Sequence, residues 1–402
     1  MRKLLGIGGL AVASALVLAG CTGGGDTPSG DGAGLVIWTD AERQPAIAAA
    51  AAAFEAETGA TVTLVQKNFE DLRSDFIAQV PTGEGPDITV GAHDWLGALV
   101  TAGVVDTIDL GNAAADFESV ALEAFTYDGQ LYALPYSLET IALIANTGLV
   151  GDQAPATWDD LIASGLASGA ERPFVINTNG ETGDGYTMYG FQTSFGAPVF
   201  VQDDAGSYTS EVGMGGAAGE AFAQWLYDNG SAGTGYLSTT IDYDINNELF
   251  NSGRAPYTVQ GPWAIGAYPD VEVAVHPIPS AGGQPAAPFV GVQGFYLSSQ
   301  SSNTLLAQDF LVNYLATEDA QRALYEADPR IPAFSSLAEE VSSDPIIAGF
   351  LASSQNGVPM PNIPEMGSVW DFWNAAESQI IGGADPVATW NQMVTDLEAA
   401  LG

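Results

Sequence analysis

The sequence predicts an α/β protein of two doubly wound, Rossmann-like lobes, and three observations lead to this fold class. The chain has 402 residues, 47% of them hydrophobic, which is enough to bury more than one core. Short apolar strands alternate with helices from residue 34 onward, an order typical of sheets covered by helices. A second alternation begins near Trp158 and indicates the second lobe.

The first alternation has the order β-α-β-α-β and predicts a parallel sheet. Pro45 suits the first turn of a helix, and Asp94 suits the position just before one. We expect strands over 35–38, 61–65 and 87–90, and helices over 45–57, 70–80 and 94–102. Ligands of such sheets bind at the carboxyl ends of the strands. The residues just past those ends are Asp40, Glu42, Arg43, His93, Asp94 and Trp95.

The second alternation continues to the C-terminus. Gly261-Pro262-Trp263 is expected to open a helix within it. A strand after residue 294 and the helices over 304–316 and 318–327 resemble further elements of the first lobe. The other expected elements are strands over 174–177 and 255–260 and helices over 158–163, 186–195, 220–228, 246–252, 370–381 and 387–401.

The N-terminus has the layout of a secretory signal peptide, followed by the only cysteine. Met1-Arg2-Lys3 is positive, residues 4–18 are apolar, and Leu18-Ala19-Gly20-Cys21 resembles a bacterial lipobox. We expect a signal peptide over 1–20, lipidation of Cys21, and a Gly/Ser/Pro-rich tether over 21–33. The lipid would anchor the protein on the extracytoplasmic face of the cell membrane. The alternative is an uncleaved N-terminal helix with a buried thiol.

The charge and the cysteine count exclude several classes of function. Two of the nine basic residues lie in the leader, so the rest of the chain has seven basic and 49 acidic residues. Such a surface repels phosphate backbones, which excludes nucleic-acid binding. One cysteine allows neither a disulfide within the chain nor a thiolate metal site. We expect no metal and no other cofactor.

Enzyme motifs are also missing from the sequence. It has no GxSxG elbow and no Walker loop, and Lys67 is the only lysine after the leader. Residues 213–218 fit a loose dinucleotide pattern without a preceding apolar strand, and residues 242–253 depart from a calcium loop at its sixth and twelfth positions. What remains is Trp and Tyr interleaved with carboxylates. This combination suits the apolar faces and paired hydroxyls of sugars.

From Leu35 to the C-terminus, the chain resembles the maltose/maltodextrin-binding proteins, which are the extracytoplasmic receptors of sugar ABC importers. The stretches that carry the resemblance are LVIW (35–38), EGPDI (84–88), AHD (92–94), GQLYALPYSLET (129–140), WDDL (158–161), QGPWAI (260–265), PFVGVQGF (288–295) and MPNIPEMGSVW (360–370). The resemblance implies a type II periplasmic-binding-protein fold, whose two lobes are joined by crossovers and close over a sugar.

The expected lobes are each built from two segments of the chain. The N-terminal lobe takes residues 34–138 and 294–341, and the C-terminal lobe takes residues 142–289 and 345–402. Hinge crossings are expected near Glu139, near Val290 and over 342–345.

The resemblance also implies a carbohydrate-binding site. It places Glu42, Arg43, Asp94 and Glu139 against sugar hydroxyls, and Tyr186, Trp263 and Trp370 in an aromatic platform on the second lobe. Each residue has a structural alternative. Glu42 and Arg43 would form an exposed ion pair, Asp94 and Glu139 would cap a helix or turn, and the tryptophans would belong to the core.

The chain departs from the family pattern at several of these positions. Gly91 replaces a usual tryptophan, and Trp95 replaces a usual arginine, so Trp95 is expected to restore the platform from the neighbouring position. Asp371 and Asn374 stand where a tyrosine and an arginine are often found. Residues 179–184 are longer than the pattern, so either Glu181 or Asp184 matches the family's acid.

The sequence therefore predicts a receptor and not an enzyme. It would bind maltose or maltodextrin-type oligosaccharides by lobe closure and deliver them, as a monomer, to a membrane permease with its ATPase. Trehalose or another disaccharide is the alternative ligand. A glycoside hydrolase and a surface lectin are the alternatives from other classes.

Overall fold

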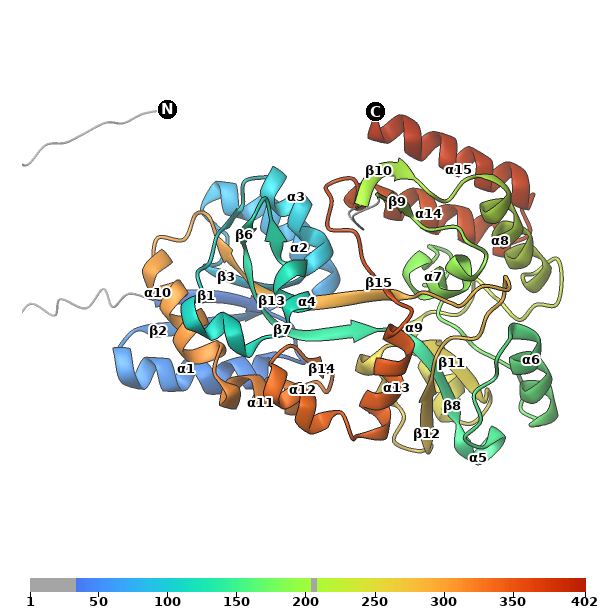
Figure 1. Ribbon diagram of the computed structural model, residues 1–402, viewed down its shortest axis with the longest axis horizontal. Coiled ribbons are helices and arrows are strands. Elements are labelled where there is room, and N and C mark those ends of the chain that lie inside the picture. The colour runs from blue at the N-terminus through green and yellow to red at the C-terminus, as the bar shows by residue number, and fades with distance from the viewer. Residues whose placement is uncertain (1–33, 204–207) are drawn as a thin grey trace, which may run out of the picture. The chain divides into compact units, whose positions relative to one another are not determined.

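The computed structural model describes residues 34–203 and 208–402, except for the side chain of Glu70. The predicted signal peptide, Cys21 and the tether lie outside the described residues. Two sheets organise the described part of the chain, a large one that begins at β1 and a smaller one around β8 (Figure 1).

The large sheet is mixed rather than parallel. Strands β2, β1 and β3 are parallel, as the alternation predicts. β13 is antiparallel to both β3 and β7, because β7 runs toward the small sheet whereas β13 starts beside the end of β7 and runs back in the opposite direction (Figure 1). The strand order is β14 (Ile331–Pro332), β7 (Ala133–Thr140), β13 (Phe289–Ser298), β3 (Ile88–Ala92), β1 (Gly34–Thr39) and β2 (Thr61–Gln66), with β4 (Val105–Asp106) and β15 (Val358–Pro359) also paired to β13.

Helices accompany this sheet close to the expected bounds. Phe54 of α1 is fully buried against Phe310, with ring centroids 5.2 Å apart. The expected helix over 304–316 divides into α10 and a π-helical turn over Leu311–Leu315. The helices are α1 (Gln44–Thr58), α2 (Phe69–Gln79), α3 (Leu96–Thr101), α4 (Ser119–Ala124), α10 (Thr304–Phe310), α11 (Glu318–Ala327) and α12 (Ser335–Val341), and a hairpin joins β5 (Thr126–Tyr127) to β6 (Gln130–Leu131).

The smaller sheet is antiparallel, with the order β11 (Tyr257–Gln260), β8 (Ala142–Asn146) and β12 (Val273–His276). The prediction of a strand over 174–177 is wrong. The Val175 amide donates one bond to the Tyr257 carbonyl (3.0 Å), but the segment continues in no ladder. A short apolar run is therefore buried here without becoming a strand.

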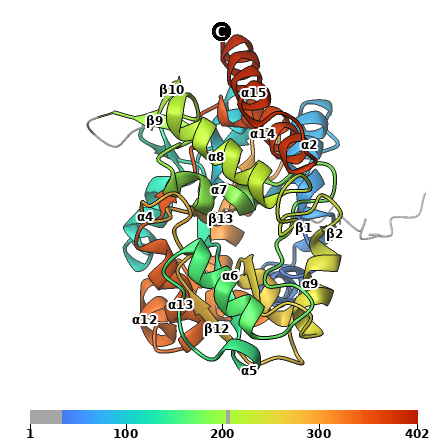
Figure 2. The ribbon, with the colours of Figure 1, turned by 90° about the vertical axis from the view of Figure 1, so that its right-hand side faces the viewer.

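The helices of the second half follow the sequence pattern, except after Gly261. There the expected helix is only a 3-10 turn, Pro262–Ala267. Helices α8, α14 and α15 pack against one another (Figure 2). The elements are α5 (Thr147–Val150), α6 (Trp158–Ala167), α7 (Gly185–Ser194), β9 (Phe200–Gln202), β10 (Tyr208–Val212), α8 (Gly216–Asn229), α9 (Tyr243–Asn251), α13 (Pro345–Ser354), α14 (Met366–Ile381) and α15 (Pro386–Leu401).

The chain passes between the two sheets at identifiable points. β7 of the large sheet ends at Thr140, and β8 of the small sheet begins at Ala142. The Thr140 hydroxyl donates to the Phe289 carbonyl (2.9 Å), which ties this passage to the start of β13. α13 begins after Asp344, whose side chain accepts from the Ile346 amide, and it contacts β12.

Two hydrophobic clusters fill the interior. One surrounds the large sheet and extends to one face of the small sheet, and the other lies among α7, α8, α14 and α15. The fully buried tryptophans of the second cluster are Trp373 and Trp390. Trp263 and Trp370 are only partly buried. Both rings pack against the edges of these clusters, so the core alternative for the two predicted tryptophans stays open.

Within the described ranges, no helix combines the length and apolar character needed to cross a bilayer. The same residues contain no cluster of His, Cys, Asp and Glu side chains that could hold a metal ion.

Candidate ligand-binding site

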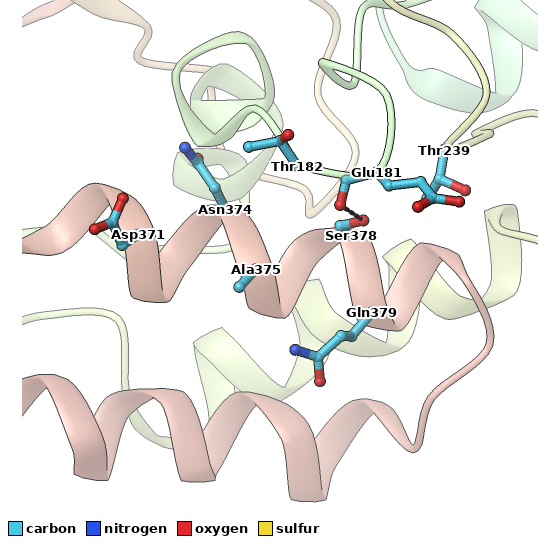
Figure 3. A pocket seen from close by; sticks show the side chains of 8 residues that line it. All are labelled: Glu181, Thr182, Thr239, Asp371, Asn374, Ala375, Ser378 and Gln379. Atoms are coloured by element: carbon cyan, nitrogen blue, oxygen red, sulfur yellow. Dashed lines mark hydrogen bonds between the residues drawn. The ribbon is translucent and has the colours of Figure 1, made fainter. Parts of the chain in front are cut away.

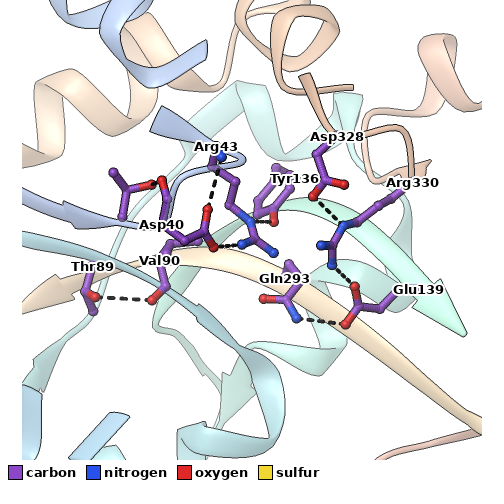
Figure 4. A network of polar contacts seen from close by, with 10 residues as sticks. Asp40, Arg43, Thr89, Val90, Tyr136, Glu139, Gln293, Asp328 and Arg330 are labelled. Carbon is purple, nitrogen blue, oxygen red and sulfur yellow. Dashed lines mark hydrogen bonds and ion pairs between the residues drawn. The ribbon is translucent and has the colours of Figure 1, made fainter. Parts of the chain in front are cut away.

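The turn after β1 places Arg43 in a buried polar cluster. Its guanidinium is ion-paired with Asp40 and donates to the Tyr136 hydroxyl through Nε (Figure 4). The Arg43 backbone amide also donates to Asp40 Oδ1 (3.0 Å). Its guanidinium carbon lies 5.0 Å from the Phe69 ring centroid, so one face of the cation is covered by an aromatic ring.

This cluster corrects the alternative of an exposed Glu42–Arg43 ion pair. Arg43 is only 3% exposed and pairs with Asp40, while Glu42 is exposed. Burial raises the pKa of Tyr243, the first residue of α9, and the charge of Glu42 contributes in the same direction.

Glu139 lies within β7 and belongs to a second buried cluster. It is ion-paired with Arg330, and its Oε1 accepts from Gln293 Nε2 (2.9 Å) (Figure 4). Arg330 also donates through Nε to Asp328 Oδ2 (2.7 Å). A cap is therefore the wrong interpretation of Glu139, because its carboxylate is fixed by a cation and an amide.

Asp94 lies in the 3-10 turn His93–Trp95 and is 6% exposed. It does not cap α3, because Trp95 precedes that helix and no side chain caps it. Burial raises the pKa of Asp94 to about 7, against the opposing charge of Arg73. Its Oδ1 is buried and has no hydrogen-bond partner among the described residues.

His93, at the end of β3, has a structural role. The Val292 amide donates to Nδ1 (3.1 Å), so Nε2 carries the proton and donates to the Met360 carbonyl (3.0 Å). Burial lowers the pKa of this imidazole to about 4. His93 therefore stays neutral and ties β13 to the segment before α14.

Trp95 takes the space beside Gly91. A Cβ added to Gly91 would lie 2.6 Å from the Trp95 ring and 3.0 Å from Tyr296, so only glycine permits this placement. The Trp95 ring is 8% exposed and packs on Phe69 with centroids 5.0 Å apart. The two departures from the family pattern at positions 91 and 95 are thus sterically linked.

The predicted platform residues gather around Phe289. Tyr186 lies 6.1 Å from Phe289 and 6.3 Å from Trp263, and Trp370 lies 6.5 Å from Phe289, measured between ring centroids. Trp370 also stacks on Trp373 at 5.6 Å. The three predicted rings are partly buried, so each retains exposed surface.

The polar and aromatic residues meet across the two sheets. The guanidinium carbon of Arg330 lies 5.6 Å from the Trp263 ring centroid. The pKa of Tyr186 is raised well above its usual value, first by burial and then by the charge of Glu139, and Asp94 contributes in the same direction. The Tyr186 hydroxyl is buried without a hydrogen-bond partner among the described residues.

Sequence reasoning missed several residues of these clusters. The pattern predicts Asp40 only as a position past a strand end, and it gives no role to Tyr136, Gln293 and Phe289, which lie within the stretches that carry the resemblance. No pattern points to Arg330 or Asp328. The scarcity of basic residues was a usable signal, because a chain with so few cations buries two of them here.

The placement of the eight predicted residues is uneven. Arg43, Asp94, Trp95 and Glu139 are buried, Tyr186, Trp263 and Trp370 are partly buried, and Glu42 is exposed. A separate cavity along α14 is lined by none of them, although it includes Asp371 and Asn374. Asp184 caps α7 by accepting from the Thr187 amide (3.0 Å), whereas Glu181 lines that cavity.

Known proteins resemble the chain in both sequence and structure. The family of bacterial extracellular solute-binding proteins matches residues 49–349. A galactooligosaccharide-binding protein of Bacillus subtilis strain 168 is 28% identical, over 98% of this chain and 96% of that protein. A maltooligosaccharide ABC transporter solute-binding lipoprotein of Streptococcus pneumoniae R6 is 26% identical over the same shares of the two chains.

Among solved structures, the Thermus thermophilus maltotriose binding protein bound with maltotriose matches with a TM-score of 0.82 and 31% sequence identity. The match covers 92% of this chain and 100% of that one. It confirms the predicted fold class, a mixed α/β protein with the periplasmic-binding-protein fold. The chain therefore belongs to the bacterial extracellular solute-binding protein family, whose members are receptors and not enzymes.

Proposed function

We propose that this protein is the substrate-binding receptor of an oligosaccharide ABC importer. Its ligand binds between the polar clusters around Arg43 and Glu139 and the aromatic platform around Phe289. The proposed contacts are the residues predicted from the sequence, joined by Arg330.

The observation that carries this proposal is a pair of buried polar atoms, Asp94 Oδ1 and the Tyr186 hydroxyl, that lack partners among the described residues. An unsatisfied buried polar group costs about 1–3 kcal/mol. The two groups interact electrostatically, since the charge of Asp94 contributes to the raised pKa of Tyr186. A ligand rich in hydroxyls can donate to the carboxylate and bond to the phenol, which removes that cost.

The aromatic platform supplies the second part of sugar recognition. Pyranose rings present apolar C–H faces, and partly exposed Trp263 and Trp370 rings offer flat surfaces for them. Each ring has a neighbour against it: the Arg330 guanidinium lies over Trp263, and Trp373 stacks on Trp370. The two rings therefore lose little further conformational freedom when a ligand binds.

Closure of two lobes explains how the ligand would favour one conformation. The predicted polar contacts come from the large sheet, and the aromatic contacts come from α7, α14 and the turn after β11. A ligand that touches both groups binds only when they are close, so it shifts the population toward the closed form. The closed form would then dock on a membrane permease whose ATPase supplies the energy.

Maltodextrins are the ligand class that we favour. The matching structure is named as a maltotriose-binding protein, and the pneumococcal relative is named for maltooligosaccharides. The relative named for galactooligosaccharides makes that class the second candidate. The lipid anchor on Cys21 and the monomeric state belong to the same proposal, and the pneumococcal relative named as a lipoprotein supports the anchor.

Thermal unfolding of the full chain with a panel of sugars tests the ligand class. The panel contains maltose, maltotriose, trehalose, β-linked galactooligosaccharides and, as the negative control, glucose. A ligand at 100 times its dissociation constant stabilises the folded protein by about 2.7 kcal/mol. We expect maltotriose to raise the melting temperature and to change tryptophan fluorescence.

Two outcomes would contradict the proposal at different levels. Stabilisation by galactooligosaccharides alone would replace the ligand class and keep the receptor. No response to any oligosaccharide would reject the sugar receptor altogether. Chromatography after long incubation covers the remaining rival, since shortened maltotriose products would indicate a hydrolase.

A further inference from the structure

Glu377 of α14 is a buried carboxyl group that the proposed binding site does not use. Its side chain is 1% exposed, and neither of its carboxyl oxygens has a hydrogen-bond partner among the described residues. The indole N–H of Trp373, one turn earlier on the same helix, is also buried without a partner there. A charge in such a place is costly unless a cation or hydrogen bonds compensate it.

The helices around Glu377 offer no cation. α7, α8 and α15 are the helices that pack most closely on α14, and none of the four contains Lys, Arg or His. The 3-10 turn His93–Trp95 also contacts α14, but His93 is neutral. Glu377 therefore has to be protonated in the folded protein, because nothing packed on its helix can balance a negative charge.

The titratable groups on these elements are mostly acidic. Burial raises the pKa of Glu377 well above its ordinary value of 4.5, and the charge of Asp184 raises it further, while the Trp373 indole acts in the opposite direction. Asp371 of α14 itself is exposed. The carboxyl groups on the packed elements are Asp94, Asp184, Glu220, Asp228, Asp396 and Glu398, and His93 and the tyrosines Tyr186, Tyr189 and Tyr227 are the other titratable groups.

The part of α14 around Glu377 holds the segment that leads into α7. The Gly185 amide donates to Asn374 Oδ1 (2.8 Å), and Ser378 Oγ donates to the Glu181 carbonyl (2.6 Å) (Figure 3). Asn374 precedes Glu377 by three residues, and Ser378 follows it directly. The start of α7 therefore depends on a short stretch of α14 that has a buried acid within it.

Asp184, the one carboxylate that acts on Glu377, is also the residue from which α7 begins. It accepts from both the amide (3.0 Å) and the hydroxyl (2.6 Å) of Thr187. Gly185 follows, and a Cβ added to it would lie 2.5 Å from the Trp373 ring, so the two helices meet without room for a side chain. Tyr186 comes next, so its position is set by this contact.

We propose that Glu377 is a positioning residue that holds the start of α7 on α14 only in its protonated form, so that sugar affinity falls when the pH rises above neutral. The inference rests on the proposed function, because Tyr186 belongs to the aromatic platform. When Glu377 releases its proton to solvent, its charge repels the Asp184 carboxylate, and hydration of the new charge separates the two helices. The displaced Tyr186 then no longer contacts the sugar.

Three variants test the proposal. Glu377→Gln keeps the shape of the protonated acid but cannot ionise. Glu398→Gln makes the same exchange at an exposed position of α15 and is the matched control. Asp184→Asn keeps a side-chain oxygen for the Thr187 amide but removes the charge that ionised Glu377 would repel.

The first measurement is titration calorimetry with maltotriose, and with a β-linked galactooligosaccharide as the second probe. We expect the unmodified protein and Glu377→Gln to bind alike near about pH 5.5, and the unmodified protein and Glu398→Gln to bind about tenfold more weakly than Glu377→Gln near about pH 9. Asp184→Asn should lose less affinity over this range than the unmodified protein. Asp94 is present in every variant, so its titration cancels in the ratio of affinities.

The second measurement is urea unfolding without sugar. Because the pKa of Glu377 is raised in the fold, the favourable contribution of its protonated form is complete below about pH 4.5 and is lost as the pH rises toward the folded value. The unfolding constant of the unmodified protein, divided by that of Glu377→Gln, should therefore rise by up to about tenfold per pH unit above about pH 5.

The two measurements separate the possible failures. The same pH dependence of affinity in the unmodified protein and in Glu377→Gln would overturn the positioning role and leave the receptor function intact, whatever the unfolding constants do. A ratio of unfolding constants that does not vary with pH would also overturn it, because Glu377 would then not be a buried neutral acid. Absence of binding by both sugars at every pH would reject the proposed function and the positioning role together.

Discussion

The polar clusters and the aromatic platform are held in place by different forces. Arg43 and Arg330 lie below 10% exposure, and each is fixed by carboxylate partners that are themselves buried. The rings of Tyr186, Trp263 and Trp370 are fixed by contact with Phe289, Arg330 and Trp373 and remain partly exposed. Removing one partner of a buried ion pair leaves the other charge without its counterion, whereas removing a partly exposed ring leaves no such charge.

Because of this difference, substitutions in the polar clusters should mainly lower stability, whereas substitutions in the platform should mainly weaken ligand binding. Loss of a buried charge partner leaves an uncompensated charge in the interior, so it destabilises the fold. Loss of a partly exposed ring removes contact area for the ligand and little core packing. The variants that follow test this separation, in order of decreasing expected effect.

Arg330→Met is expected to have the largest effect. It leaves the carboxylates of Glu139 and Asp328 buried without their cation, and breaking such a pair costs about 3–5 kcal/mol of unfolding free energy. The measurement is urea unfolding of the ligand-free protein. Arg322→Met is the matched control, because Arg322 also has two carboxylate partners but at the surface, where a pair contributes about 0–1 kcal/mol. Equal losses in both variants would contradict the distinction.

Asp94→Asn should stabilise the ligand-free protein at high pH. The pKa of Asp94 is about 7 in the fold, against an ordinary value of 3.8, because burial disfavours its charged form. The favourable contribution of the protonated group is therefore complete below about pH 4 and is lost as pH rises through 7. The variant should exceed the unmodified protein by up to about 4 kcal/mol near pH 8.

The measurement is the difference in unfolding free energy between Asp94→Asn and the unmodified protein at each pH. Subtracting the two denaturation curves at each pH cancels the other carboxylates of this acidic chain. We expect the difference to shrink as pH falls from about 8 to about 4, while sugar affinity is weaker in the variant. A difference that does not vary with pH would show that Asp94 is not the group that titrates.

Trp263→Ala is expected to weaken sugar binding with little change in stability. Truncation of a tryptophan at the centre of a binding site costs about 2 kcal/mol, or roughly 30-fold in Kd. Trp373→Ala is the converse, since that ring is fully buried and its loss should cost about 3–5 kcal/mol of stability. Calorimetric titration and urea unfolding of both variants distinguish the roles. If Trp263→Ala unfolds as easily as Trp373→Ala, the platform is part of the core.

Glu42→Gln should have the smallest effect. The side chain is exposed, so the unfolding free energy should change by no more than about 0.5 kcal/mol. Sugar affinity should fall by a few-fold, in line with about 0.5–1.5 kcal/mol for one hydrogen bond. The same two measurements apply, and an unchanged affinity would remove Glu42 from the proposed site.

Local patterns predicted much of the fold because they depend on neighbours in sequence. Pro45 and the alanine-rich stretch after it gave the bounds of α1 to within one residue, and α11 was predicted without error. The segment over 174–177 failed, since an apolar run is compatible with burial in either a strand or a loop. The prediction of an all-parallel sheet also failed, because β13 pairs antiparallel with β3 and β7 and such pairing depends on where distant segments meet.

The candidate site shows the same limit at the level of side chains. Glu139 and Tyr186 were predicted through the family resemblance, but their neighbours Arg330 and Phe289 lie far away in sequence. The cap assigned to Asp94 was wrong, since a 3-10 turn separates it from α3 and buries its carboxylate. Burial and partner identity are properties of the folded chain, so no local pattern reports them.

By itself, the sequence determined the α/β class, the membership suggested by its motifs, the chemistry of acids and aromatic rings, and the scarcity of cations. These follow from residue type and from spacing along the chain. Only the tertiary structure decided that Arg330 reaches Glu139, that Trp95 fills the space left by Gly91, and that Glu181 and Thr182 line a cavity along α14. Each of those contacts joins segments whose meeting depends on the packing of two sheets and their helices, and this packing minimises the free energy of the whole chain rather than of any one segment.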